Sequence, residues 1–356
     1  MADGEHVLVC VAWPYANGPL HLGHVAGCYL PPDICARFER ARGNRVLMVS
    51  GSDEHGTPIT VSAEQEGRNP QDIVDEYHSI NTQALLDLGC TWLPNVDQRG
   101  IDYGGSLFNR TSDPRHKVKV QENFQLLYDA GFFERRTMQQ YFEVHPDGGG
   151  RFLPDRYIEG TCPTCGAENA RGDQCDECGA TYESSELNNP VSKMNPELKV
   201  EIRDTEHLFY RLDLFQEALE LHAEKNYAVW KPNVRAMTKQ WLDMGLRPRA
   251  VTRDLEWGIE VPLDSDDWGN KCIYVWFEAV QGYLTCSQIW SETFGDSASW
   301  EKWWMNDSTQ KQRHYYFLGK DNVPFHTVIW PAIIMGLNHV RNGKSADDPI
   351  QLPQDG

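Results

Sequence analysis

Two histidines flank a glycine near the amino terminus, in the stretch "WPYANGPLHLGH" (13–24). His21 and His24 follow the apolar run "VLVCVAW" (7–13), which places them in a glycine-bearing turn after a predicted strand. Such a turn at the start of a helix is a common place to bind phosphate, because backbone N–H groups and imidazole nitrogens donate hydrogen bonds there. The alternative is that both histidines only cap the helix that follows.

Four of the ten cysteines are clustered in "CPTCGAENARGDQCDECG", as Cys162-x2-Cys165 and Cys175-x2-Cys178. Two residues between thiolates let one tight turn present both sulfurs, and two such turns make a tetrahedral site. Because all four positions are cysteine, the pattern predicts a closed, structural zinc site rather than a catalytic one. Unliganded cysteines or a redox pair are the alternative.

The elements that must position these residues alternate between short strands and longer helices. Strand-like runs at 7–13, 46–50 and 315–319 are each followed at once by a polar loop: "PYANGPLHLGH", "GSDEHGTP" and "KDNVPFH". This alternation predicts an α/β fold with a doubly wound parallel sheet. In such sheets ligands bind beyond the carboxyl ends of the strands, so we expect the three loops to line one crevice.

Helical spacing of apolar residues predicts helices in "VAGCYLPPDICARFERARG", "QDIVDEYHSINTQALLDLG" and "KVQENFQLLYDAG". Pro31 and Pro32 should kink or restart the first of these. After Gly131 aromatic residues, glycines and the cysteine cluster replace the helical pattern, and helical spacing returns near residue 216. We therefore expect one large domain in two halves, 1–134 and 216–356, with a small module inserted at 135–215.

The composition is that of a globular protein, with 356 residues of which 40% are hydrophobic. No apolar stretch approaches the roughly 20 residues that cross a bilayer, and the amino terminus lacks an export signal, so we expect a cytoplasmic protein without membrane contact. A net charge of −19 disfavours non-specific binding to nucleic acid. The acidic residues suit either a high-salt cytoplasm or an ordinary acidic surface.

Six blocks of the sequence resemble one family. They are "PYANGPLHLGH", "GSDEHGTP", "FLPDRYIEGTCPTCG", "VTRDLEWGIEVP", "IYVWFEAVQGY" and "FLGKDNVPFHTVIWP". "HLGH" is similar to the HIGH signature of class I aminoacyl-tRNA synthetases, and the blocks together resemble the methionyl-tRNA synthetase family, in its order, from about residue 6 to 353. The resemblance implies a Rossmann-like catalytic domain with an inserted connective-peptide domain that carries the zinc knuckle.

The resemblance also implies a reaction. Methionine and ATP, with Mg²⁺, would form methionyl-adenylate, and the methionyl group would then pass to tRNA(Met). The attack of a carboxylate on the α-phosphate needs positioning and stabilisation of charge on the phosphate oxygens. We expect His21 and His24 to stabilise this charge and so to be the catalytic residues. The other expected ATP-binding residues are Asn17, Gly23, Glu260, Asp321 and Lys320, of which the lysine either contacts phosphate or faces solvent.

The methionine site implied by the resemblance combines an acidic and an aromatic part. Asp53 and the backbone near Ala12 and Trp13 would hold the ammonium group, with Arg253 as the partner that keeps Asp53 ionised; a purely structural ion pair is the alternative. Aromatic surfaces accept a thioether well. The proposed side-chain pocket comprises Tyr15, Trp276, Ala279, Tyr283 and His326. Trp276, Ala279 and Tyr283 share one predicted helix face, which spacing alone would assign to ordinary core and which the resemblance assigns to the pocket.

The sequence departs from the family in two respects. It ends before the lysine-rich KMSKS loop and the anticodon-binding domain, so we expect an amino-terminal part whose adenylation is impaired unless a further segment, in the same or a separate carboxyl-terminal chain, is present. It has one cysteine cluster where two-zinc relatives have another cysteine pair, which predicts one zinc ion. The insertion is also too short to be the large editing domain of the leucine, isoleucine and valine enzymes, which argues against those relatives. A non-catalytic zinc-bearing binding module and a nucleotidyltransferase that does not use tRNA are the alternatives.

Overall fold

Four parallel strands form the central sheet. The computed structural model describes residues 4–92, 104–154, 157–171, 175, 177–178, 186–264, 267–294, 299–305 and 311–350. The strands stand in the order β13-β1-β2-β3. Their bounds are His6–Val11 for β1, Arg45–Ser52 for β2, Gly104–Arg110 for β3 and Gln312–Phe317 for β13. Since all neighbours are parallel, their carboxyl ends meet at one edge, and the predicted α/β fold with a parallel sheet is confirmed.

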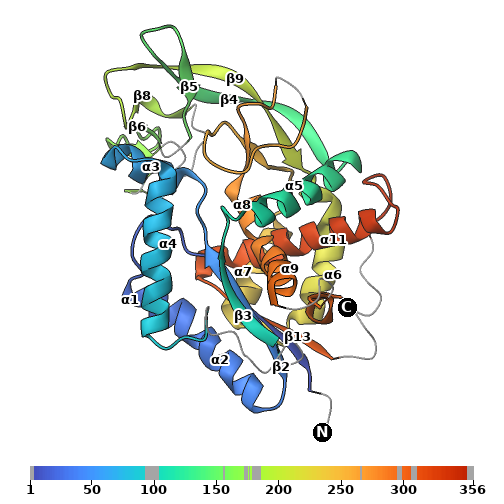
Figure 1. The fold of residues 1–356 in the computed structure, drawn as a ribbon. Helices are drawn as coiled ribbons and strands as arrows, with labels where there is room; N and C mark the ends of the chain where they lie inside the picture. Colours follow the sequence, from blue (N-terminus) through green and yellow to red (C-terminus); the bar gives the residue numbers. More distant parts are fainter. Residues whose placement is uncertain are drawn as a thin grey trace.

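The sheet is covered on both faces. Successive side chains of a strand point to opposite sides, so the continuous apolar run of β1 divides between two cores. Leu8 and Cys10 lie in the larger core with α9 (Gly282–Phe294) and α11 (Trp330–Arg341), whereas Val7 and Val9 lie in the smaller core with α2 (Leu30–Ala41). Figure 1 shows α2 and α4 (Pro70–Asp87) on one side of the sheet and α9 and α11 on the other.

The helical segment that begins at Leu22 restarts at the two prolines, as predicted. It consists of α1 (Leu22–His24), a π-helical turn (Val25–Tyr29) and then α2. The N–H of Leu30 bonds to the carbonyl of Val25, five residues back. Because Pro31 and Pro32 have no N–H to donate, they fit the first turn of the new helix α2, where no partner is needed.

Strand β3 was not predicted, because its sequence "GGSLFNR" lacks a strand-like apolar run. Close packing explains why the first two residues of this strand are glycines. A Cβ atom on Gly104 would lie 2.0 Å from the carbonyl oxygen of Val46, and one on Gly105 would lie 2.6 Å from Nε1 of Trp290. The close approach of β2 and α9 therefore requires glycine at both positions.

The body contains further helices, some predicted and some not. α4 and α5 (Pro114–Asp129) correspond to two predicted helices, and the remaining ones are α3 (Thr57–Glu66), α6 (Gln216–Asn226), α7 (Pro232–Asp243), α8 (Val275–Ala279) and α10 (Glu301–Trp304). Shorter helical turns cover Leu212–Phe215, Lys320–Asn322 and Phe325–Ile329. None of the helices in the described part of the chain combines the length and the apolar composition that a membrane span requires.

A long two-stranded ribbon begins and ends the inserted module. β4 (Phe133–Val144) pairs antiparallel with β9 (Lys199–Tyr210) along its whole length. Between them lie β5 (Gly150–Phe152), β6 (Ile158–Thr161), β7 (Ala170–Arg171) and β8 (Asn188–Ser192). The module stands at one end of the molecule (Figure 1). The domain boundaries at 134/135 and 215/216 stay predictions, and the ribbon begins two residues before the first and ends five before the second.

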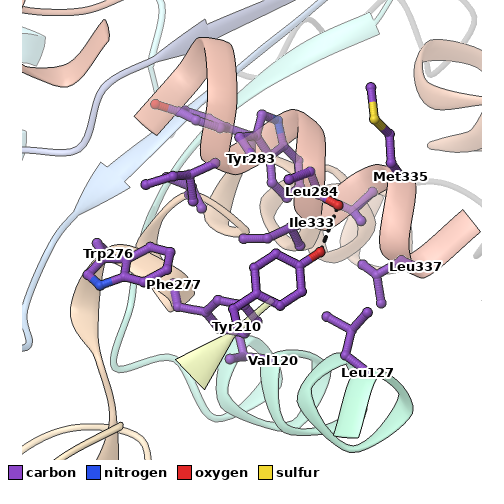
Figure 2. Close-up of a cluster of buried hydrophobic side chains, with 14 of the residues drawn as sticks. Val120, Leu127, Tyr210, Trp276, Phe277, Tyr283, Leu284, Ile333, Met335 and Leu337 are labelled. Atoms are coloured by element: carbon purple, nitrogen blue, oxygen red, sulfur yellow. Dashed lines mark hydrogen bonds between the residues drawn. The ribbon is translucent and has the colours of Figure 1, made fainter. Parts of the chain in front are cut away.

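The ribbon is anchored in the larger core. Tyr210 at the end of β9 is fully buried there, and its hydroxyl donates a hydrogen bond of 2.8 Å to the carbonyl oxygen of Ala332 in α11 (Figure 2). A Cβ atom on Gly336 would lie 2.8 Å from that hydroxyl and 3.0 Å from Leu127. The short strands β10 (Arg249–Ala250), β11 (Thr252–Arg253) and β12 (Cys272–Ile273) then lead to α8.

Candidate active site

Backbone hydrogen bonds join the loops at the carboxyl edge of the sheet. The N–H of Asp53 after β2 donates to the carbonyl of Pro14 at 2.7 Å, and the N–H of Ala16 donates to the carbonyl of Asp53 at 2.8 Å. The N–H of Ala12 after β1 donates to the carbonyl of Phe317 in β13 at 2.9 Å. The three polar loops therefore leave the same edge of the sheet, as the sequence predicts, and two of them are paired directly.

His21 and His24 stack on one another at the start of α1. Their ring centroids are 3.7 Å apart, and Nδ1 of His21 accepts a 3.3 Å hydrogen bond from the backbone N–H of His24, so His21 caps the helix. A Cβ atom on Gly23 would lie 2.9 Å from the His21 ring, which is why this position is glycine. The capping alternative describes the geometry of His21, and the phosphate-binding role stays a prediction.

His24 is suited to donate a hydrogen bond as a neutral imidazole. Burial and the neighbouring His21 lower the pKa of His24 below its usual value. Its Nδ1 atom is buried and has no hydrogen-bond partner among the described residues. Asn17 lies exposed on the same loop, and Asn81 of α4 fixes the loop through the N–H of Leu20 (3.0 Å) and the carbonyl of Gly18 (3.2 Å). Sequence reasoning missed Asn81, although it is a fully buried amide inside an amphipathic helix.

The other residues predicted to bind ATP lie in two different places. Lys320 and Asp321 stand on the loop after β13, with side chains 80% and 86% exposed. Glu260 instead forms an ion pair with Lys117 of α5 and lines a groove of about 570 Å³ between the body and the inserted module. No contact joins Glu260 to Asp321 in the described part of the chain, and their roles in binding ATP stay predictions.

The predicted ion pair between Asp53 and Arg253 is not formed among the described residues of this structure, and the role of Arg253 in the site stays a prediction. Arg253 places its guanidinium 4.3 Å from the ring centre of Tyr274 and donates to the carbonyl of Thr252 at 3.0 Å. The carboxylate of Asp53 accepts only the backbone N–H of His55, at 3.4 Å, within the described residues. Burial and the negative charge of Glu278 raise the pKa of Asp53 well above its usual value.

A buried ion pair beside Asp53 escaped the sequence analysis. Glu54 is 0% exposed, and both its carboxylate oxygens accept hydrogen bonds from Nε of Arg110 at 2.9 and 2.8 Å. Ser112 also donates to this carboxylate, and the indole N–H of Trp257 donates to the Glu54 carbonyl at 2.7 Å. Glu54 therefore holds the loop after β2 against β3, and its charge is balanced without a ligand.

The predicted aromatic pocket is built on two helices rather than one. α8 ends at Ala279 and α9 begins at Gly282. The side chain of Gln281 interrupts the helix, since its amide occupies the carbonyl of Phe277 at 2.9 Å. Trp276 and Tyr283 nevertheless remain in the same buried cluster, 8% and 2% exposed (Figure 2).

The other predicted pocket residues surround this cluster unevenly. The hydroxyl of Tyr283 lies 2.7 Å from Nε2 of His326. The Trp13 ring packs so closely on α9 that a Cβ atom on Gly282 would lie 2.7 Å from it. Ala12 is buried, whereas Tyr15 is 41% exposed. The structure therefore places an aromatic cluster beside the carboxyl end of β2, which Asp53 follows. The role of this cluster in binding methionine stays a prediction.

The four clustered cysteines have the geometry of a tetrahedral metal site. Their sulfurs all lie within 4.8 Å of one another, and two of the separations are 3.9 Å (Cys162 to Cys178) and 3.7 Å (Cys165 to Cys175). Four sulfurs each about 2.3 Å from one ion would lie about 3.8 Å apart. The N–H groups of Thr164 and Cys165 point at the sulfur of Cys162 (3.4 and 3.5 Å), as they would toward a thiolate ligand.

The family model described as "tRNA synthetases class I (M)" matches residues 7–346. The chain belongs to this family. It is 46% identical to the methionine–tRNA ligase of Chloroflexus aggregans over 356 residues, covering 98% of this chain and 56% of that protein. It is 47% identical to the methionine–tRNA ligase of Thermoplasma volcanium over 333 residues, covering 94% and 57%.

A solved structure confirms the fold of this family member. The methionyl-tRNA synthetase of Mycobacterium tuberculosis in complex with methionyl-adenylate matches with a TM-score of 0.66 at 22% identity, over 99% of this chain and 56% of that one. A second structure of the same protein with methionyl-adenylate bound gives a TM-score of 0.67. The chain thus spans a little more than half the length of the relatives it matches.

Proposed function

We propose that the crevice at the carboxyl edge of the sheet activates methionine with ATP. The observation on which this rests is the union of three loops at one edge: the His21–His24 pair after β1, the buried Asp53 after β2, and His326 after β13 bonded to Tyr283. Methionine's carboxylate would attack the α-phosphate of ATP, giving methionyl-adenylate and pyrophosphate. The groups of this site position the reactants and stabilise charge.

Each loop has its own task in this proposal. His21 and His24, with the helix start and Asn17, bind the phosphates of ATP, whose charge is shared with Mg²⁺ when the ion is bound. The exposed Asp321 binds the ribose and Lys320 contacts phosphate. Asp53 attracts the ammonium group of methionine, because a cation entering a buried site needs an anion. Trp276, Tyr283 and Trp13 surround the thioether, a group that packs well against aromatic rings.

The inserted module has a supporting role. We propose that the four cysteines hold one structural zinc ion, because four thiolates and no open position favour zinc in a closed site. The module's ribbon is anchored in the body through Tyr210, so a metal that fixes the module would also fix its place beside the crevice. We propose that the inserted module is the connective-peptide domain, which separates the two halves of the catalytic domain.

The second half-reaction completes the proposal. We propose that the methionyl group then passes to tRNA(Met). We also propose that the protein acts in the cytoplasm, where translation uses the product. Residues 1–356 contain no lysine-rich signature loop, so the proposal assigns that role to a segment outside them, in the same or a second chain. An acidic chain with a net charge of −19 also needs other surfaces to hold an RNA.

A titration followed by tryptophan fluorescence tests the amino-acid specificity. Trp13 and Trp276 lie in the proposed pocket, so methionine should change the emission saturably, while valine, leucine and lysine should require concentrations at least about tenfold higher, since a misfit side chain loses 1–3 kcal/mol. An equal response to all amino acids would contradict the proposal.

A further inference from the structure

Two buried carboxylates meet at one histidine beside the proposed ammonium site. The backbone N–H of His55 donates to Oδ1 of Asp53 at 3.4 Å, and Nδ1 of the same residue lies 2.8 Å from Oε1 of Glu278 in α8. Asp53 and His55 are each 6% exposed and Glu278 is 0% exposed. The loop after β2, which carries Asp53 and His55, also packs directly on α8, since a Cβ atom on Gly56 would lie 3.4 Å from Val275.

Glu278 has unused bonding capacity. Its second oxygen, Oε2, is buried and has no hydrogen-bond partner among the described residues. A buried carboxylate oxygen without a donor is costly, so such an atom indicates a missing partner. The adjacent carboxylate of Glu54 shows the contrast, because Arg110 and Ser112 satisfy it fully.

The charges of this cluster do not balance. When both are ionised, Asp53 and Glu278 bring two negative charges, which is why Glu278 adds to the effect of burial in raising the pKa of Asp53. The only cationic group that contacts either of them in the described chain is the His55 ring, which brings at most one positive charge. The Glu278 carboxylate raises the pKa of His55 although burial opposes it. One negative charge therefore remains in a closed site.

The surrounding charged groups do not supply the missing cation. Lys117 pairs with Glu260 at the surface, and Arg253 lies over Tyr274. On α5, burial and the charge of His55 lower the pKa of His116 to about 3, so that ring is neutral. The thiol of Cys272 near Glu278 is also uncharged, because burial raises its pKa to about 12.

We propose that Glu278 is a second carboxylate of the ammonium site, so that the substrate's α-ammonium group balances Asp53 and Glu278 together while His55 holds both. This inference rests on the proposed function. An ammonium group has three N–H donors, one of which can serve Oε2 of Glu278. A substrate with a neutral α-hydroxyl would leave the charge unbalanced, so the pair selects for a free amino group.

The test compares L-methionine with its α-hydroxy analogue, 2-hydroxy-4-(methylthio)butanoate, by calorimetric titration of the whole chain and the variant Glu278→Gln. Glutamine keeps the size and an acceptor for His55 but removes the charge. We expect methionine to bind at least about 30-fold more weakly to the variant, since removing one member of a buried, hydrogen-bonded charge pair weakens binding by that factor or more. The affinities for the α-hydroxy analogue and for ATP should stay within about twofold.

Two further variants keep the result interpretable. Glu278→Asp restores the charge and should recover most of the affinity for methionine. Glu143→Gln removes an equally buried carboxylate, 0% exposed, from the inserted module and should leave binding unchanged. Thermal unfolding of each variant establishes that it is folded.

The outcomes separate this inference from the proposed function. Equal methionine affinity in Glu278→Gln and wild type, or equal losses for methionine and the hydroxy analogue, would overturn the role of Glu278. If wild type prefers another amino acid and Glu278→Gln weakens that one selectively, the inference stands and the methionine proposal falls. If wild type binds no amino acid, both are overturned.

Discussion

Nε2 of His326 accepts a hydrogen bond of 2.7 Å from the hydroxyl of Tyr283. The direction follows from the other ring nitrogen. Nδ1 lies 2.7 Å from the carbonyl oxygen of Asn322, which can only accept, so Nδ1 carries the proton. Burial lowers the pKa of His326 to about 4, so the ring is neutral near pH 7 and this arrangement is fixed.

The substitution Tyr283→Phe tests the importance of this contact. It removes the hydroxyl but keeps the ring against Tyr316, whose centroid is 5.6 Å away. Because a lost hydrogen bond of this kind costs about 1 kcal/mol, we expect the KM for methionine to rise about fivefold and the KM for ATP to stay unchanged. Tyr128→Phe, on an exposed part of α5, is the control. Unchanged methionine kinetics in Tyr283→Phe would exclude the contact from the site.

The cysteine cluster predicts one metal ion per chain. Elemental analysis should find a zinc ratio near one, and Cys165→Ser should lose the metal and lower the unfolding temperature. Cys35→Ser changes a half-buried cysteine of α2 outside the cluster and should keep both. A ratio near two, or a full metal content in Cys165→Ser, would contradict the single closed site.

Buried and exposed ion pairs should differ in their contribution to stability. Arg110→Met leaves the fully buried Glu54 without its cation, so we expect a loss of about 3 kcal/mol in the free energy of unfolding. Arg135→Met removes ion pairs to Glu206 and Asp267 whose side chains are about half exposed, and it should cost less than about 1 kcal/mol. Chemical denaturation measures both, and similar losses would show that Glu54 does not depend on Arg110.

His116 should make the fold sensitive to acid. This residue is fully buried, its Nδ1 lies 2.7 Å from the hydroxyl of Thr285, and its pKa is lowered to about 3. In the unfolded chain a histidine titrates near 6.5. The stability that the neutral ring contributes is therefore complete above about pH 6.5 and declines as the pH falls toward about 3, by up to about 1.4 kcal/mol per pH unit.

Denaturation at several pH values between 7 and 4 measures this dependence. His116→Gln lacks the titrating ring, so its free energy of unfolding should fall less steeply with pH than that of wild type. The partly buried His78 and His326, with pKa values lowered to about 4, contribute a remaining slope. The same slope in variant and wild type would rule out His116 as a source of the acid sensitivity.

Short-range patterns predicted the parts of the site that depend on neighbouring residues. The Cys-x2-Cys spacing determines the cluster because one turn presents both sulfurs. The three strand-end loops were predictable because parallel strands end at the same edge of a sheet. The prolines at 31 and 32 predicted the helix restart for an equally local reason, the missing N–H groups.

Long-range partners were not predictable in the same way. Asp53 and Arg253 carry opposite charges, but the fold places Arg253 over Tyr274 and brings Glu278 close to Asp53. The break between α8 and α9 follows from the side-chain amide of Gln281, whose bond to Phe277 leaves no periodic signal. Such outcomes depend on which of several possible partners packing brings nearest.

The exchange of labelled pyrophosphate into ATP, driven by each of the twenty amino acids, tests the central claim most directly. It should be measured on this chain and on any longer protein that contains it, because the relatives extend beyond the matched region. We expect exchange that depends on methionine alone and falls about 100-fold or more in His24→Ala, since one lost donor to a charged transition state costs that much. Exchange driven by another amino acid, or none with methionine in either protein, would contradict the account.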